Sequence, residues 1–269
     1  MTGVVLATMA VSDPMGQQLY ETQLLEHLPS AGVNARACRV RSMRSSLPGE
    51  ARAPLRALGT APPSVQHAVA RYLYGAGLVH RCDLRLPAAR GEVVTVHDLA
   101  PLRFPDEGEI PPRAADSLRR ARAVICPSQF AADEVKDLFG IDAQVIHNGL
   151  DPAVWGDVPA AALDGLELPE QFVLHSGGAT KRKNLGALAD AWHLVAAGHP
   201  TTSLVLCGPP DTRRTALFAD LPRVRMLGKV DRSVHLALMS AAAVVVVPST
   251  YEGFGFPALE AMARGTAVA

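Results

Sequence analysis

The first half of the chain alternates short apolar runs with longer stretches whose apolar residues repeat at helical spacing. This alternation predicts buried strands of a parallel sheet joined by crossover helices. Ser128 stands just before one of the helical stretches, where its hydroxyl would cap the helix. The expected strands are Val4–Thr8, Val93–Val96, Ala123–Cys126 and Gln144–His147, and the expected helices are Gln17–Leu28, Arg113–Ala121 and Gln129–Phe139.

Two segments interrupt this alternation. Arg41–Ser64 mixes arginine with serine, proline and glycine without a clear period, so we expect a mobile surface loop that contains a short helix. A solvated loop is favoured there over a basic surface that contacts an acceptor. Asp151–Glu170 is rich in alanine, proline and aspartate, and we expect it to connect two domains.

After this connector the alternation restarts more regularly. Val244–Val247 is apolar at every position, as in a central strand with both faces covered by helices. The expected strands are Phe172–His175, Ser203–Cys207, Val224–Leu227, Ala243–Val247 and Thr266–Ala269, and the expected helices are Asn184–Ala197, Thr212–Ala219, Ser233–Ser240 and Pro257–Arg264.

The whole pattern predicts an α/β protein with two Rossmann-like, doubly wound parallel-sheet domains, over residues 1–165 and 166–269. The last expected strand begins where the sequence stops, which would leave an unpaired apolar edge. We therefore expect the second domain to be incomplete and the sequence to be truncated at its carboxyl end.

Composition narrows the class of protein. The 269 residues carry 26 Lys and Arg against 26 Asp and Glu, with 48% hydrophobic and 19% charged residues. This balance argues against a disordered chain, a coiled coil or a protein that coats nucleic acid. No apolar run reaches the ~20 residues of a membrane-spanning helix, and Met1–Ala10 lacks the basic start of a signal peptide. We expect a cytoplasmic protein, and the arginine-rich and alanine-rich composition favours a bacterial source.

The cysteines Cys38, Cys82, Cys126 and Cys207 are widely separated and form no Cys-x-x-Cys pair. Their spacing fits neither a disulfide framework nor a zinc site. The sequence therefore predicts reduced, buried thiols and no metal site.

The strongest chemical signal is the segment Glu252–Glu260, which reads Glu-Gly-Phe-Gly-Phe-Pro-Ala-Leu-Glu. Gly253 and Gly255 let the backbone approach a ligand closely, and the proline suits the first turn of a helix whose N-terminus attracts anions. A carboxylate accepts hydrogen bonds from two hydroxyls at once, so Glu252 and Glu260 suit the diol of a ribose or a sugar. The segment predicts a site for a nucleoside diphosphate that carries a sugar.

A second signal follows the strand expected at Phe172–His175. Gly177 and Gly178 form a turn at the strand's carboxyl end, and Arg182 and Lys183 stand behind it. Open α/β sheets bind ligands at this end of their strands. The two cations would neutralise a diphosphate and stabilise it as a leaving group. The spacing is not that of a P-loop, which requires G-x-x-x-x-G-K-[ST].

Taken in order, these segments resemble the family 4 glycosyltransferases of the GT-B fold. The resemblance extends over essentially the whole chain and is strongest from Phe172 onward. It is carried by Gly177-Gly178, Arg182–Leu185, Cys207-Gly208, Leu227-Gly228 and Glu252–Glu260, and in the first half by Val96–Leu99, Pro127-Ser128 and His147–Asp151. It implies a retaining, metal-independent transferase that binds a nucleotide-sugar donor between two Rossmann-like domains.

The resemblance also implies roles for single residues. Lys183 and Glu252 would be catalytic, together with His97, which would face the donor sugar from the first domain. Glu252 would hold the donor sugar, and Glu260 the ribose hydroxyls. The other donor-binding residues that it implies are Gly16, Gly177, Gly178, Arg182, Gly253, Phe254, Gly255 and Phe256.

The implied reaction moves a hexose, with mannose as the first candidate, from a GDP-sugar or UDP-sugar to a sugar or a lipid-linked glycan. A lipid-linked acceptor would bring the protein into peripheral contact with the inner face of the membrane. No cofactor, metal or nucleic-acid partner is expected. Two alternatives stay open: a truncated, non-catalytic remnant that binds nucleotide, and a nucleotide-sugar epimerase of the same fold.

Overall fold

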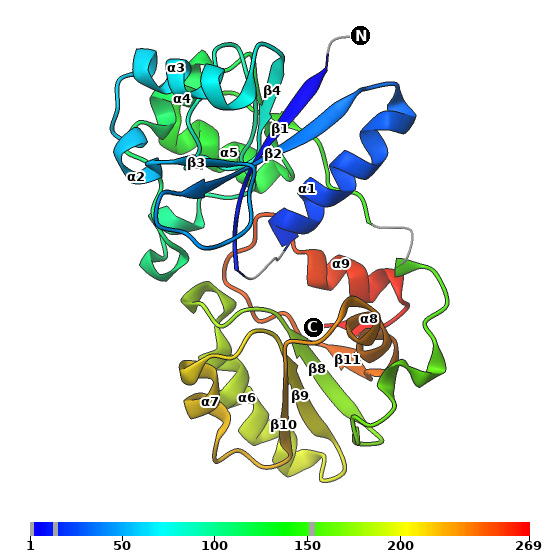
Figure 1. The fold of residues 1–269 in the computed structure, drawn as a ribbon. Coiled ribbons are helices and arrows are strands. Elements are labelled where there is room, and N and C mark those ends of the chain that lie inside the picture. Colours follow the sequence, from blue (N-terminus) through cyan, green and yellow to red (C-terminus); the bar gives the residue numbers. More distant parts are fainter. Residues whose placement is uncertain (1–2, 13–15, 151–153) are drawn as a thin grey trace. The chain divides into compact units, whose positions relative to one another are not determined.

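The computed structural model describes residues 3–12, 16–150 and 154–269. The chain divides into two compact units, Met1–Asn148 and Gly149–Ala269, which we call the first and the second unit. Each unit is built around one parallel sheet (Figure 1).

The connector between the predicted domains packs with the second unit, so the structural division comes earlier in the chain than residue 165. The guanidinium of Arg264 donates to the carbonyls of Val154 and Gly156 at 2.8 and 2.6 Å. Leu163 and Leu168, at the end of the connector, pack against the core of the second sheet.

The sheet of the first unit has seven strands in the order β3-β2-β1-β4-β5-β6-β7, and all neighbours are parallel. The sequence order reverses between β1 and β4, as in a doubly wound fold. The strands are β1 (Val4–Met9), β2 (Ala35–Ser42), β3 (Ala51–Ala53), β4 (Leu78–Arg81), β5 (Val93–Thr95), β6 (Ala123–Cys126) and β7 (Gln144–Val145).

The helices of the first unit are α1 (Gly16–His27), α2 (Leu55–Leu58), α3 (Pro63–Tyr74), α4 (Ala114–Arg120) and α5 (Gln129–Phe139). The predicted cap of α5 is confirmed, because the hydroxyl of Ser128 accepts a hydrogen bond from the backbone N–H of Ala131 at 3.1 Å. The predicted helices near 17–28 and 113–121 are confirmed to within a residue of each end.

The expectation of a loop over 41–64 is only partly right. The short helix is present as α2, but the segment also contains the end of β2 and the edge strand β3, and α3 and β4 follow. In β2 the buried side chains of Cys38 and Val40 alternate with exposed or half-buried arginines. These arginines lie on the outer face of the strand and interrupt its apolar residues, so β2 contains no apolar run that would identify it as a strand.

The sheet of the second unit has the order β10-β9-β8-β11-β12, again with parallel neighbours, so the sequence order reverses between β8 and β11. The predicted alternation of strands and helices is confirmed here throughout. The elements are β8 (Phe172–Ser176), α6 (Leu185–Gly198), β9 (Ser203–Cys207), α7 (Thr212–Phe218), β10 (Val224–Gly228), α8 (Arg232–Ala241), β11 (Val244–Val245), α9 (Phe256–Ala263) and β12 (Ala267–Val268).

Both faces of this second sheet are covered by helices, as the all-apolar run at β11 predicts. Figure 1 shows α6 and α7 on one face of the sheet and α8 on the other, and alternate residues of β8 and β9 belong to the two corresponding core clusters. One face packs on α8 and α9 through Leu174, Val205, Cys207, Leu238 and Ala261, and the other packs on α6 and α7 through Leu204, Leu206, Leu188, Trp192 and Phe218.

Candidate functional site

The candidate site lies where the strand order of the second sheet reverses. β8 ends at Ser176 and leads through Gly177 and Gly178 into the 3₁₀ turn Lys181–Lys183, and β11 leads into the loop before α9. Because β8 and β11 are parallel neighbours, both loops start at the same edge of the sheet. This edge, at a topological switch point, is where open α/β sheets bind ligands.

An ion pair joins the two loops. The ammonium of Lys183 lies 2.6 Å from Oε1 of Glu252, and Nη1 of Arg182 lies 2.9 Å from Oε2. The backbone N–H of Thr250 also donates to the carbonyl of Arg182 at 2.9 Å. The structure therefore brings together both predicted cations and the first predicted carboxylate.

Burial and charge act in opposite directions on Glu252. Burial raises its pKa, but the charge and hydrogen bond of Lys183, together with the Ser249 hydroxyl and the charge of Arg182, hold the pKa of Glu252 below its ordinary value. Lys183 is only 7% exposed, so the carboxylate also offsets the desolvation of the ammonium. The pair keeps a charged lysine at the ends of the strands.

Glu260 lies on α9 and is only 3% exposed. Its Oε1 is 2.7 Å from Nη2 of Arg232 on α8, and its Oε2 is 4.0 Å from Nδ1 of His235 on the same helix. The Nε2 atom of His235 is 2.6 Å from the hydroxyl of Ser176, the last residue of β8. Glu260 is thereby tied to the end of the strand that precedes Gly177.

The glycine-rich segment forms the start of α9. Gly255 has φ +89° and immediately precedes the helix, and Pro257 occupies its first turn. The rings of Phe254 and Phe256 meet edge to face, with centroids 5.2 Å apart. Gly253 is buried, directly after Glu252. The predicted helix start therefore lies in the same loop as the ion pair.

Arg214 of α7 is a buried cation at this edge that the sequence did not single out. Its guanidinium donates to the carbonyl of Gly177 and, at 3.2 Å, to that of Pro209. Gly208 packs so closely here that a Cβ on it would lie 2.0 Å from the Gly177 carbonyl oxygen. Arg214 and Gly208 thus fix the path of the turn after β8.

Ser176, Arg232 and His235 were also missed. Arg232 and His235 are three residues apart on a predicted helix, so they share a face, but nothing in that spacing identifies Glu260 as their partner. The available signal was the position of Ser176, directly before the glycine turn.

His97 and Gly16 belong to the first unit. His97 follows β5, and its ring meets the ring of Tyr20 on α1 edge to face, with centroids 4.9 Å apart. The hydroxyl of Tyr20 pairs with that of Thr95 at 3.2 Å, and Thr95 pairs in turn with Nε2 of His80 at 2.7 Å. Aromatic and hydroxyl contacts therefore position the His97 ring.

The Nε2 atom of His97 is buried and has no hydrogen-bond partner within the described parts of the chain. Burial lowers the pKa of His97 to about 4, so the ring is neutral near pH 7. Gly16 is the first residue of α1, and the loop before it includes positions 13–15, which lie outside the described residues. The predicted roles of His97 and Gly16 stay predictions.

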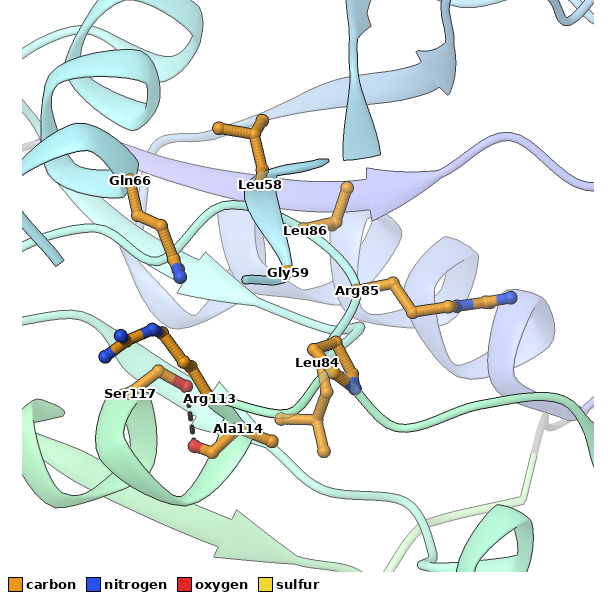
Figure 2. Close-up of a pocket in the computed structure, with 10 residues that line it drawn as sticks. Leu58, Gly59, Gln66, Leu84, Arg85, Leu86, Arg113, Ala114 and Ser117 are labelled. Carbon is orange, nitrogen blue, oxygen red and sulfur yellow. Dashed lines mark hydrogen bonds between the residues drawn. The ribbon is translucent and has the colours of Figure 1, made fainter. Parts of the chain in front are cut away.

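A small cavity also lies in the first unit, and all the residues that line it belong to that unit. Figure 2 shows Gln66, Arg113 and Ser117 around it, with the Ser117 hydroxyl donating to the carbonyl of Ala114 at 2.8 Å. Its volume of about 10 Å³ is the space of about one water molecule. This cavity is too small for a nucleotide.

The four cysteines are free thiols with buried side chains, as predicted. Burial raises the pKa of the Cys126 thiol to about 12 and raises the pKa of the other three thiols as well. Among the described residues, no helix combines the length and the apolar character needed to cross a bilayer.

Comparison with known proteins agrees with these observations. Residues 14–154 match the model of Glycosyltransferase Family 4, and residues 170–269 match the model of Glycosyl transferases group 1. The first match alone covers more than half of the chain. The second includes every site residue described above in the second unit.

Curated relatives are similar over part of the chain. The alpha-maltose-1-phosphate synthase of Mycolicibacterium smegmatis is 32% identical over 216 residues, which cover 65% of this chain and 52% of that protein. The phosphatidyl-myo-inositol mannosyltransferase of Mycobacterium tuberculosis is 34% identical over 148 residues, which cover 54% of this chain and 39% of that protein. The chain thus spans about half or less of the length of these relatives.

The fold is shared with solved structures. The Anabaena protein HepE, crystallised with UDP and glucose, matches with a TM-score of 0.72 and 20% identity, covering all of this chain and 80% of that one. A likeness at this identity concerns the fold. It confirms the predicted α/β architecture of two Rossmann-like, parallel-sheet domains, the GT-B class.

Proposed function

The chain belongs to glycosyltransferase family 4, and from that membership we propose that it transfers a hexose from a nucleoside diphosphate sugar to an acceptor hydroxyl. The observation that carries the proposal is the ion pair between Lys183 and Glu252 at the switch point of the second sheet. A ligand held there meets two cations, two carboxylates and the N-terminus of α9 within one set of loops.

In this proposal Lys183 and Arg182 bind the diphosphate and stabilise its charge as it leaves the sugar. An ammonium has three N–H donors, so a contact with Glu252 is compatible with others to phosphate oxygens. Fixed cations of this kind act without the reorganisation that water would need. Glu252 holds hydroxyls of the donor sugar, and the Gly253–Phe256 backbone contacts sugar and phosphate.

Glu260 accepts hydrogen bonds from the ribose hydroxyls, and His97 contacts the donor sugar from the first unit. Gly177 and Gly178 let the turn after β8 approach the phosphates, and Gly16 lies near both the donor phosphate and the acceptor. We further propose that the sugar keeps its anomeric configuration and that no metal takes part. The leaving phosphate oxygen would then take the proton of the acceptor hydroxyl on the same face of the sugar.

The relatives also bear on which hexose and which nucleobase the donor carries. The mycobacterial mannosyltransferase supports mannose, whereas the UDP and glucose in the HepE crystal support a UDP-glucose donor. We therefore propose a GDP-hexose or UDP-hexose donor. The acceptor is a soluble sugar or a lipid-linked glycan at the cytoplasmic face of a membrane.

The test is incubation of the chain with a panel of radiolabelled UDP-, GDP- and ADP-hexoses and a mixture of sugar and lipid-linked acceptors. Release of nucleoside diphosphate together with a labelled glycoside supports transfer, and the anomeric configuration of that glycoside tests retention. Unchanged rates in EDTA test metal independence. Nucleotide binding without release identifies a non-catalytic remnant, and a labelled hexose isomer as the product identifies an epimerase.

A further inference from the structure

The second carboxylate of the site is the more deeply buried of the two. Glu260 is 3% exposed and lies about one turn into α9. Removing a carboxylate from water costs several kcal/mol unless charged or hydrogen-bonding partners replace the water. Arg232 supplies the charge, with Nη2 at 2.7 Å from Oε1. This ion pair joins α8 to α9 at one side of the carboxylate, and the Arg232 side chain is itself 36% exposed.

His235 faces the other oxygen of the same carboxylate. Its Nδ1 is 4.0 Å from Oε2 of Glu260 and 3.5 Å from Nη1 of Arg232, and its Nε2 is 2.6 Å from the Ser176 hydroxyl. Burial lowers the pKa of His235, against the opposing effect of Glu260. A neutral ring has one donor and one acceptor nitrogen. Because the Arg232 guanidinium can only donate, Nδ1 accepts from its Nη1 and Nε2–H donates to the Ser176 hydroxyl. His235 therefore orients the guanidinium that faces Glu260.

These contacts join three elements at the switch point. Ser176 ends β8 directly before the Gly177 turn, Arg232 and His235 share one face of α8, and Glu260 projects from α9. Moreover, Nε and Nη2 of Arg232 are buried without an aligned hydrogen-bond partner in the part of the chain that the structure describes, although Nη2 forms the ion pair with Glu260. Buried donors of this kind are uncommon in proteins, and an oxygen of a bound ligand would satisfy Nε.

A diol is recognised only if both carboxylate oxygens are correctly oriented, to within roughly 0.5 Å in functional sites. We propose that Arg232, His235 and Ser176 are positioning residues that hold the Glu260 carboxylate in the orientation that binds the ribose diol of the donor. This inference rests on the proposed function, in which Glu260 contacts the ribose. It adds a set of contacts that determines how strongly the site prefers a ribonucleotide to a deoxyribonucleotide.

The probes are therefore UDP and GDP, each paired with its 2′-deoxy form and titrated calorimetrically into the whole chain. The measured quantity is the ratio of the two dissociation constants within a pair. A hydrogen bond to a charged group contributes about 1.5–3 kcal/mol, so the original chain should prefer the ribonucleotide about tenfold or more. Glu260→Gln should reduce that preference to about twofold or less.

Arg232→Ala and His235→Ala should reduce the preference nearly as far as Glu260→Gln does. Ser176→Ala should reduce it by about threefold, because it removes only the partner of His235. Arg232→Lys keeps the charge and should retain part of the preference. Ser233→Ala, an exposed position on the same helix, is the matched control and should leave the ratio unchanged. Near-ultraviolet circular dichroism of each variant checks that it is folded.

The outcomes separate this inference from the proposed function. If Glu260→Gln abolishes the preference while folded Arg232→Ala and His235→Ala keep it, the positioning role is wrong and the role of Glu260 stands. If Glu260→Gln itself keeps the preference, Glu260 does not bind the ribose hydroxyls. Its proposed role and the positioning role of its neighbours are then both overturned. If Arg232→Ala does not fold, the ratio of dissociation constants measured with Arg232→Lys and His235→Ala tests the positioning role instead.

Discussion

Lys183 donates a 2.6 Å hydrogen bond to Glu252, although 69 residues separate them in the chain. The contact exists because β8 and β11 are parallel neighbours and their following loops leave the sheet at one edge. A lysine that pairs with a carboxylate at a switch point stays charged and stays in place. We expect this pair to matter more for the donor than for the stability of the fold.

Lys183→Ala should lower turnover at least about tenfold, which corresponds to about 1.4 kcal/mol of leaving-group stabilisation. Arg182 still neutralises Glu252 in this variant, so the second unit should remain folded. Initial rates of nucleoside diphosphate release from the active donor measure the effect. Lys136→Ala, which removes an exposed lysine of the first unit, is the control. Equal turnover in the two variants would remove Lys183 from the mechanism.

Gly208→Ala should destabilise the second unit by about 1–3 kcal/mol, the usual cost of overpacking. The added methyl group would collide with the Gly177 carbonyl oxygen, and Gly208 has φ +141°. Gly186→Ala, on α6 with nothing near its Cβ position, should instead stabilise it by about 0.5–1 kcal/mol. Trp155 and Trp192 both lie in the second unit. Tryptophan fluorescence during urea unfolding therefore measures the stability of this unit in both variants. An unchanged urea midpoint for Gly208→Ala would show that the turn after β8 adapts.

The elements of the second unit can be predicted from the sequence more completely than those of the first unit. In the second unit β8, β9 and the run through β11 are apolar segments followed by glycine or proline, so the strands, the order of the loops and the positions of Glu252 and Lys183 in neighbouring loops can be predicted. In the first unit the arginines of β2 obscure a half-buried strand. The next elements along the chain, α3 and β4, were not predicted either.

The contacts of Glu260 show a different limit. Arg232 and His235 reach it only because α8 and α9 pack side by side on one face of the sheet. That arrangement depends on tertiary packing, which no local pattern contains. Arg214 is similar, because a single arginine in a short helix gives no sign that its side chain will bind the Gly177 carbonyl.

Glu21 of α1 should make the stability of the first unit depend on pH. Burial raises its pKa to about 7, with a smaller opposing effect of the hydrogen bond from Gln17. The folded state therefore binds the proton more tightly than the unfolded state does. The stabilising effect is fully present below pH 4.5 and is lost as the pH rises through about 7.

Glu21→Gln should remove this dependence. The variant should match the original chain at pH 4 and exceed it by about 3 kcal/mol at pH 8. Urea unfolding followed by circular dichroism at the two pH values measures the difference. Glu26→Gln, exposed on the same helix, should leave the stability difference between the two pH values as it is. A Glu21→Gln variant that is no more stable at pH 8 than the original chain would contradict the prediction.

The buried pair of Arg81 and Glu92 should be the most sensitive charged contact of the first unit. Both side chains are 1% exposed, and Nη2 of Arg81 lies 2.8 Å from Oε1 of Glu92. Arg81→Met should destabilise the unit by about 3–5 kcal/mol, because it leaves a buried carboxylate without its partner. Urea unfolding followed by circular dichroism measures the loss.

The double variant Arg81→Met/Glu92→Leu is the control for that prediction, since it removes both charges and should recover much of the loss. Asp142→Ala breaks the exposed pair with Lys136 and should change stability by less than about 1 kcal/mol. A double variant that is less stable than Arg81→Met would show that the pair contributes through its packing.

Hydrogen–deuterium exchange with and without UDP or GDP tests the central claim most directly, because it locates the bound nucleotide. The proposed function predicts slower exchange of backbone amides in residues 176–184 and 249–260, and no such protection in Lys183→Ala at the same nucleotide concentration. Protection confined to other parts of the chain, or equal protection in Lys183→Ala, would contradict a donor site at the switch point of the second sheet.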